Sequence, residues 1–290
     1  MSIHRRRFIR SLAGGGLLLP GMLSEIMASE TAPAPDPLAP KRPHFAAKAK
    51  RVIFLFMTGG VSHVDTFDPK PVLNAKHDEQ HRARNFYKGS GWKFRPYGEC
   101  GTEVSDLFPH IGSQADDLCM IRSMTNLNGD HFGATIGLHT GSATFNRPSM
   151  GSWISYGLGS ENANLPAFMV LSAGLPYAGG QVWGSDFLPA VHQGTRVIPG
   201  SEPIANMHRR LETAELQRTE LDMLSYFNQQ HLKDRQGDSQ LSSRIKSFET
   251  AAGMQLEAPE LFNVRQESQS TLDLYGLDPD DTSSFAWQCL

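Results

Sequence analysis

Hydrophobic positions along the chain gather in three short runs separated by long polar stretches. The first run, Val52–Met57, is apolar at every position, which is typical of a strand covered on both faces, as in a largely parallel sheet. Leu118–Met124 and Pro166–Ser172 predict a second and a third strand. A repeated alternation of strand and crossover predicts an α/β fold, with a mostly parallel sheet flanked by helices.

Helical periodicity is strongest in the second half of the chain. Residues 105–117 predict a short capped helix, and a longer one is expected from Ser201, since Ser can cap a helix and Pro203 is tolerated in its first turn. A further helix is predicted from about Leu241. Apolar residues recur at three- and four-residue steps in both long helices, which indicates core packing: Ile204, Met207, Leu211, Ala214, Leu221, Leu224 and Phe227 in one, Ile245, Phe248 and Ala252 in the other.

The last residues resemble the beginning of a helix. Residues 278–284 are a strong helix-start signal, and Phe285–Leu290 begin an apolar face that stops after less than two turns. Isolated helices this short are marginal in water. We therefore expect the chain to be C-terminally truncated within the domain, with more of the α/β domain following in the full-length protein.

An export signal is predicted at the N-terminus. Arg5–Arg10 match the twin-arginine pattern, and the following stretch to Leu23 is too short and glycine-rich to span a bilayer as a helix. The expected organisation is a signal at residues 1–28, a proline-rich linker at 29–50 and a folded body at 51–290. The expected partner is the twin-arginine translocation machinery, and the expected location is the periplasm or the cell surface.

Composition and charge argue against some classes of protein. The chain has 290 residues, 39% of them hydrophobic and 20% charged, which is ordinary for a globular domain. Removing residues 1–28 takes away four arginines and one glutamate, and moves the formal charge from −3 to −6. An acidic body argues against nucleic acid as a partner. Three scattered cysteines are too few for a disulfide framework or a zinc finger.

Polar residues follow the first predicted strand. Ser62, His63, Asp65 and Asp68 come directly after Gly59 and Gly60. Ligands of open parallel sheets bind beyond the carboxyl ends of the strands, and imidazole and carboxylate groups are common metal ligands. The alternative is structural, because Asp65 and Asp68 could instead form turns or cap the next segment before Pro69.

A second polar loop follows the second predicted strand. It contains Asp130, His131 and His139, which could serve as metal ligands or as acid/base groups. The small residues Gly133 and Gly137 would allow a helix to begin close to the sheet, with free amide groups that favour an anion. The alternative is a glycine-rich entry into a packed helix, with both histidines bonded to backbone carbonyls.

The two loops together carry a family resemblance. The sequences from Val52 to Pro71, from Cys119 to Met124 and Leu138-His-Thr-Gly141 resemble the DUF1501 family of exported proteins, which is similar to sulfatases and other members of the alkaline phosphatase superfamily. The resemblance implies a central sheet with helices on both faces. It also implies a site with one or two divalent metals, such as zinc, calcium or magnesium, that hydrolyses a sulfate or phosphate ester.

The sequence departs from the sulfatase pattern at the nucleophile. In sulfatases a modified Cys or Ser within Cys/Ser-x-Pro-x-Arg lies about ten residues before the Gly of a Thr-Gly pair. Here the matching positions hold His131 and Thr135, so covalent catalysis does not transfer. The remaining ligands of the superfamily would lie beyond Leu290.

The resulting expectation is a metal-dependent hydrolase acting on a sulfated or phosphorylated small molecule or glycan. Its catalytic candidates are His131 and Asp130. Its metal-ligand candidates are His63, Asp65, His131, Asp68 and His139. The competing hypotheses are a non-catalytic surface or carbohydrate-binding protein and an inactive truncated member of the family.

Overall fold

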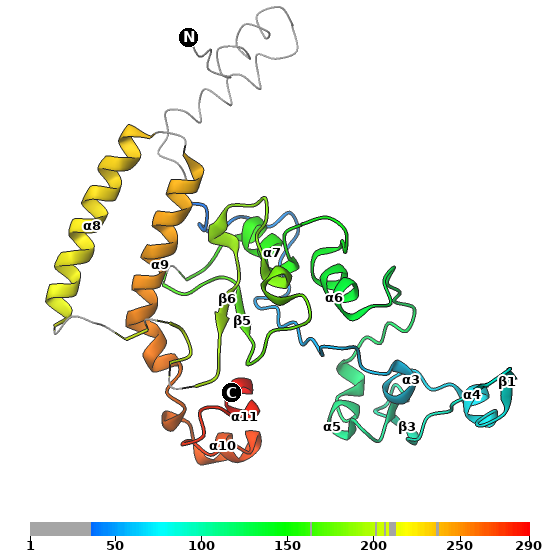
Figure 1. Ribbon diagram of the computed structural model, residues 1–290. Coiled ribbons are helices and arrows are strands. Elements are labelled where there is room, and N and C mark those ends of the chain that lie inside the picture. The colour runs from blue at the N-terminus through cyan, green and yellow to red at the C-terminus, as the bar shows by residue number, and fades with distance from the viewer. Residues whose placement is uncertain (1–35, 163, 201, 206, 209–212, 236–237) are drawn as a thin grey trace, which may run out of the picture. The chain divides into compact units, whose positions relative to one another are not determined.

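The computed structural model describes residues 36–290 except 163, 201, 206, 209–212 and 236–237 (Figure 1). The predicted export signal lies outside these residues. The described chain forms two compact units. Unit 1 comprises residues 36–45, Gly151–Ala173 and Ser185–Leu290, and unit 2 comprises Ala46–Met150 and Gly174–Gly184.

Unit 2 consists of short helices and two small hairpins. The antiparallel pairs are β1 with β2 and β3 with β4. Its elements in chain order are α3 (His63–Thr66), α4 (Pro71–Ala75), β1 (Gln80–Arg82), β2 (Asn85–Phe86), β3 (Phe94–Tyr97), β4 (Thr102–Ser105), α5 (Pro109–Gly112), η1 (Ala115–Asp117), α6 (His131–Thr140) and η2 (Gly179–Trp183).

Unit 1 holds the long helices α8 and α9, which lie side by side (Figure 1). Its two strands, β5 and β6, pair in parallel. The elements in chain order are α7 (Met150–Leu158, whose first residue belongs to unit 2), β5 (Met169–Leu171), η3 (Ala190–His192), β6 (Thr195–Val197), α8 (Ala214–Asp234), α9 (Ser239–Leu261), η4 (Val264–Gln266), α10 (Gln269–Tyr275) and α11 (Phe285–Cys289).

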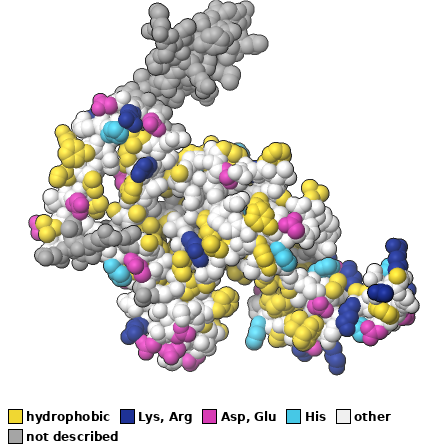
Figure 2. All heavy atoms as spheres, viewed as in Figure 1, with side chains coloured by type: hydrophobic (Ala, Val, Ile, Leu, Met, Phe, Trp, Pro, Cys, Tyr) yellow, Lys and Arg dark blue, Asp and Glu magenta, His cyan; other side chains and the backbone are white. Residues whose placement is uncertain are grey.

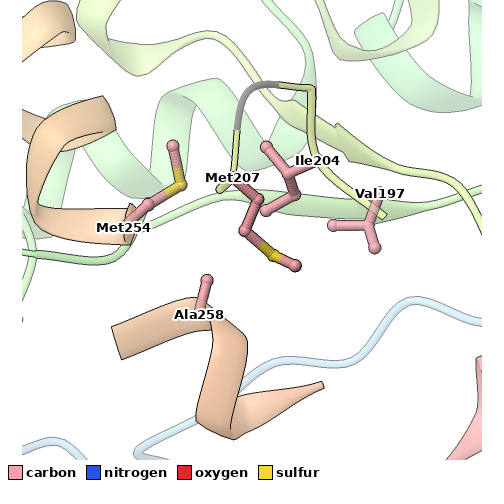
Figure 3. Packing of buried hydrophobic residues seen from close by; sticks show 5 residues of the cluster. All are labelled: Val197, Ile204, Met207, Met254 and Ala258. Carbon is pink, nitrogen blue, oxygen red and sulfur yellow. The ribbon is translucent and has the colours of Figure 1, made fainter. Parts of the chain in front are cut away.

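The main apolar cluster of unit 1 joins α9 to strand β6 and the turn that follows it (Figure 3). Met254 and Ala258 are four residues apart on α9, so they present one face of the helix. They pack against Val197 of β6 and against Ile204 and Met207.

Of the predicted α9 stripe, Ile245 is buried, but Phe248 is 63% exposed, so its predicted core role is wrong. The predicted core role of Leu221, Leu224 and Phe227 is also wrong, because no residue of α8 is buried.

Several predicted elements are confirmed. The strand β5 lies within the third predicted strand. Residues 105–117 contain the helical segments α5 and η1, but neither has the predicted side-chain cap. The helix predicted from about Leu241 is α9, which Asp238 caps by accepting hydrogen bonds from the amides of Gln240 and Leu241. The helix-start signal before Phe285 is also real, because the Ser284 side chain accepts a hydrogen bond from the Trp287 amide.

The helix expected from Ser201 is wrong, because the long helix begins further along the chain. Ser201 lies outside the described residues, but Ile204 and Met207 lie in a turn in which the Met207 amide donates to the Ile204 carbonyl. Helix α8 begins only at Ala214, where Thr213 accepts a hydrogen bond from the Leu216 amide. A real N-cap thus lies downstream of the one that the sequence suggested, and the first apolar residues of the stripe serve the core from a turn.

The mostly parallel sheet is not observed in the described residues, which form three two-stranded sheets of which only β5–β6 is parallel. The strands predicted at Val52–Met57 and Leu118–Met124 are wrong, since neither segment pairs with a strand and Arg122 and Ser123 lie in a turn. Leu55 is 86% exposed. The reason is that a strand requires a neighbouring backbone, and no segment of the described chain is placed to provide one.

The described part of the predicted linker lies partly against unit 1. Asp36 forms a salt bridge of 2.9 Å with Lys246 of α9, and the Leu38 side chain is buried. The Lys41 amide donates to the Leu158 carbonyl at the end of α7. Residues 36–41 therefore contact the body directly.

Among the described residues, no helix is both long and apolar enough to cross a membrane.

Candidate functional site

The loop after Met57 is shaped by two glycines with positive φ, Gly59 and Gly60. It leads into α3, whose first residue is the exposed His63. The Ser62 hydroxyl donates to Asp65 Oδ2 over 2.6 Å. Hydrogen bonds from Ser62, and then from Ser90, hold the pKa of the Asp65 carboxyl below its usual value. Asp65 is therefore a carboxylate at neutral pH, with one oxygen already bonded.

Asp68 ends the same loop and is paired with a cation. Its Oδ2 lies 2.7 Å from Lys70 Nζ. The hydrogen bond from Lys70 is the largest influence on the Asp68 carboxyl and lowers its pKa, to which the charges of Lys70, His63 and Arg122 also contribute. His63 thus lies close enough to both carboxylates to favour their charged forms, so the structure does bring these three candidates together.

Arg122 is a site residue that the sequence did not single out. Its Nε donates to the Phe67 carbonyl over 2.9 Å, which joins the segment of the second predicted strand to the loop after the first. Only the fold shows that its guanidinium lies beside Asp68.

Asp130 and His131 form the N-terminus of α6. The Asp130 side chain caps the helix, since its Oδ1 accepts a hydrogen bond of 2.8 Å from the Gly133 amide. A Cβ at Gly133 would lie 2.5 Å from Asn128 Nδ2 and 2.8 Å from Asp130 Oδ2, so a larger residue there would have to displace these side chains. His131 is exposed at the first helical position, so its imidazole is accessible to a ligand.

Tyr177 links the two polar loops and was also missed. Its ring stacks on His131, with centroids 4.6 Å apart and an interplanar angle of 14°. Its ring and hydroxyl also lie 3.7 Å from where a Cβ of Gly59 would be. Tyr177 lies in a glycine-rich stretch without a motif, so nothing in the sequence connects it with either loop.

His139 lies apart from these groups. Its Nδ1 is 2.8 Å from the Thr135 carbonyl, and the edges of Phe54 and Phe56 contact its ring. Burial lowers the pKa of His139, although the bond to Thr135 opposes this. Eight residues separate it from His131, which is about 12 Å along a helix. The two histidines therefore cannot ligate one ion, and His139 serves as a neutral packing residue.

The candidate His and Asp side chains were predicted to be metal ligands. No group of three or more His, Cys, Asp or Glu side chains that could hold an ion occurs among the residues the structure describes. Asp65, Asp68 and Asp130 each have an oxygen bonded to Ser62, Lys70 and Gly133 respectively. In this arrangement the described donors do not fit a complete metal centre.

A family model described as "Protein of unknown function (DUF1501)" matches residues 49–290, which is most of the chain. The chain belongs to the DUF1501 family. This confirms the family resemblance that the two loops carried, and the match begins two residues before the predicted body. Neither a curated protein nor a solved structure matches the chain. The candidate site of this DUF1501 chain lies entirely within the matched region.

Proposed function

We propose that this DUF1501 chain is an exported, sulfatase-like hydrolase of sulfate or phosphate esters, reaching the periplasm or the cell surface by the twin-arginine route. The observation that carries the proposal is the meeting of the two polar loops in unit 2. Tyr177 lies against both Gly59 and His131, and Arg122 binds the loop that holds Asp65 and Asp68. The groups that the sequence selected separately are thus parts of one region.

The N-terminus of α6 is suited to an anionic ester. The first amides of a helix and its dipole favour a negative charge, and those of His131 and Phe132 make no backbone hydrogen bond within the described chain. His131 is accessible there and can donate a proton to a leaving oxygen or take one from water. Asp130 orients the helix start through its cap and is the second acid/base candidate.

No step is assigned to a metal, because the described donors do not converge on one. The family resemblance still predicts zinc, calcium or magnesium, and His63, Asp65 and Asp68 are the nearest set of suitable side chains. Metal content measured on protein purified from the periplasm tests that prediction separately from turnover.

The proposal is tested with aryl sulfate and aryl phosphate esters, assayed with and without added divalent ions. We expect hydrolysis by the full chain and a loss of about 100-fold or more in His131→Ala, since general acid–base groups contribute that much. The matched control is His231→Ala, because His231 is exposed on α8 and lies in unit 1. Equal rates for His131→Ala and the unmodified chain would refute the assigned role.

A second candidate function is non-catalytic carbohydrate binding. It is favoured by the aromatic pair itself, because Tyr177 is 54% exposed and is stacked on His131 rather than on a nucleophile. Glycan retention without turnover, abolished in Tyr177→Ala and kept in His131→Asn, would support this function over the enzyme.

A further inference from the structure

Unit 2 carries a strongly basic segment, residues 70–95, which we call the basic arm. It contains α4 and the β1–β2 hairpin, and it ends in β3. Seven of its residues are Lys or Arg and only two are Asp or Glu, in a chain whose formal charge is −3. All seven cations are exposed: Lys70, Lys76, Arg82, Arg84, Lys88, Lys93 and Arg95. Figure 2 shows Lys and Arg side chains gathered over α4 and β1.

Most of this charge is not neutralised by the protein. Within the described chain, Lys70 pairs with Asp68 and Arg95 with Asp106, but the four cations between Arg82 and Lys93 have no acidic partner. The hairpin holds two of them together, since Arg82 pairs with Asn85 across a tight turn that contains Arg84. Crowded charges of one sign raise the local concentration of the opposite ion far more than isolated ones.

Aromatic side chains lie among the cations. Phe86 is 60% exposed and Trp92 is 51% exposed. Aromatic residues and arginine are enriched at interaction surfaces, and here both kinds of side chain are exposed in one short segment. The composition of the arm therefore indicates a binding surface.

The first residue of the arm is joined to the candidate site, because Lys70 Nζ lies 2.7 Å from Asp68 Oδ2. Ser90 also lies near the site, since it contributes to the lowered pKa of Asp65. The Ser90 amide also donates to Asn74 Oδ1 over 2.8 Å, which closes the arm on itself. A polymer bound along the arm would therefore pass next to the loop that holds His63, Asp65 and Asp68.

We propose that the basic arm binds a sulfated polysaccharide and holds its sulfate groups beside the candidate site. This names the substrate class of the proposed function and rests on it. A sulfated glycan offers what the arm can recognise, namely sulfate anions repeated along a chain and sugar faces for exposed rings. Nucleic acid would meet the same cations, so the choice of a sulfated glycan rests on the proposed function, and duplex DNA is one of the ligands in the test.

The test compares two variants of the full chain that lose the same charge. The arm variant is Arg82→Gln, Arg84→Gln, Lys88→Gln, and the control is Arg218→Gln, Lys233→Gln, Arg235→Gln, which removes three exposed cations at α8. Binding is measured to dextran sulfate, unsulfated dextran, polyphosphate and duplex DNA over a series of salt concentrations. We expect salt-sensitive binding to dextran sulfate, an affinity lower by about tenfold or more in the arm variant, and a control close to the unmodified chain.

The outcomes separate the proposals. Equal losses in both variants would show a net-charge effect and overturn the inference, as would unchanged binding by the arm variant. Binding as tight to duplex DNA, polyphosphate or unsulfated dextran would overturn the choice of partner. Retention of dextran sulfate by a chain that hydrolyses no ester would refute the proposed hydrolase while leaving the arm as a glycan-binding surface.

Discussion

Gly159 offers the sharpest test of the structure, because it ends α7 where residues 38–41 lie against the helix. Its φ is +76°, and a Cβ at this position would lie 2.2 Å from the Ala39 carbonyl oxygen. The adjacent backbone carries two hydrogen bonds to the segment, from Lys41 N to the Leu158 carbonyl and from Ser160 N to the Leu38 carbonyl. Gly159→Ala must therefore either strain the turn or displace the segment.

The loss of folding stability can be worked out for each of the two responses, a strained turn or a displaced segment. Alanine in a left-handed conformation costs about 1–2 kcal/mol. Displacing the segment loses two hydrogen bonds worth about 0.5–1.5 kcal/mol each and the burial of Leu38, worth about 1.5–3 kcal/mol. The released residues regain backbone entropy, which offsets part of the second loss. We expect the free energy of unfolding of unit 1 to fall by about 2–4 kcal/mol.

The control is Gly157→Ala, two residues earlier and inside α7. A Cβ there meets nothing within 4 Å, so the exchange should stabilise the helix by about 0.5–1 kcal/mol. Urea denaturation measures both effects, and the rate of tryptic cleavage after Lys41 reports whether the segment has detached. A Gly159→Ala protein with an unchanged urea midpoint and unchanged cleavage at Lys41 would refute the docked position of residues 38–41.

Three further predictions concern stability. The pKa of His192 is lowered by its burial and by the charge of Lys41. The free energy of unfolding should therefore fall as the pH drops below about 6.5, where only the unfolded state takes the proton, and level off below the folded pKa. The urea midpoints at pH 7.5 and pH 5 should differ in the unmodified chain and converge in His192→Asn. Met254→Ala should destabilise unit 1 by about 2–5 kcal/mol in the same assay, with exposed Met223→Ala within about 0.5 kcal/mol. Asp130→Ala should cost about 0.5–2 kcal/mol through the lost cap, and Asp130→Ser should recover most of it.

The features that could be predicted from sequence are those that depend on a few neighbouring residues. Helix starts at Asp238 and Ser284 could be found because the cap and the amides it binds lie within three residues. The cap near Ser201 was misplaced because several Ser and Thr residues precede the same apolar stripe. Choosing between them requires knowing that Ile204 and Met207 pack from a turn, which is information about tertiary structure.

The sheet could not be predicted because pairing is a non-local property. Val52–Met57 has the composition of a buried strand, but composition reports how well a segment would suit a covered position and not whether a partner backbone is present. The strand predicted at Pro166–Ser172 is confirmed because β6 lies beside it, with Met169 opposite Thr195 and Leu171 opposite Val197. The same kind of signal was therefore right once and wrong twice.

The two candidate loops come together for a reason other than the predicted sheet edge. Phe54 and Phe56 contact His139 near the end of α6, whereas Gly59 lies by Tyr177, which stacks on His131 at its start. The segment from Phe54 to Gly59 therefore runs in the opposite direction to α6, whose residues 131–139 span about 12 Å. Its direction brings the loop with His63 to the N-terminus of the helix. The sequence predicted that the two loops meet at a sheet edge, whereas the structure joins them through aromatic contacts along one helix.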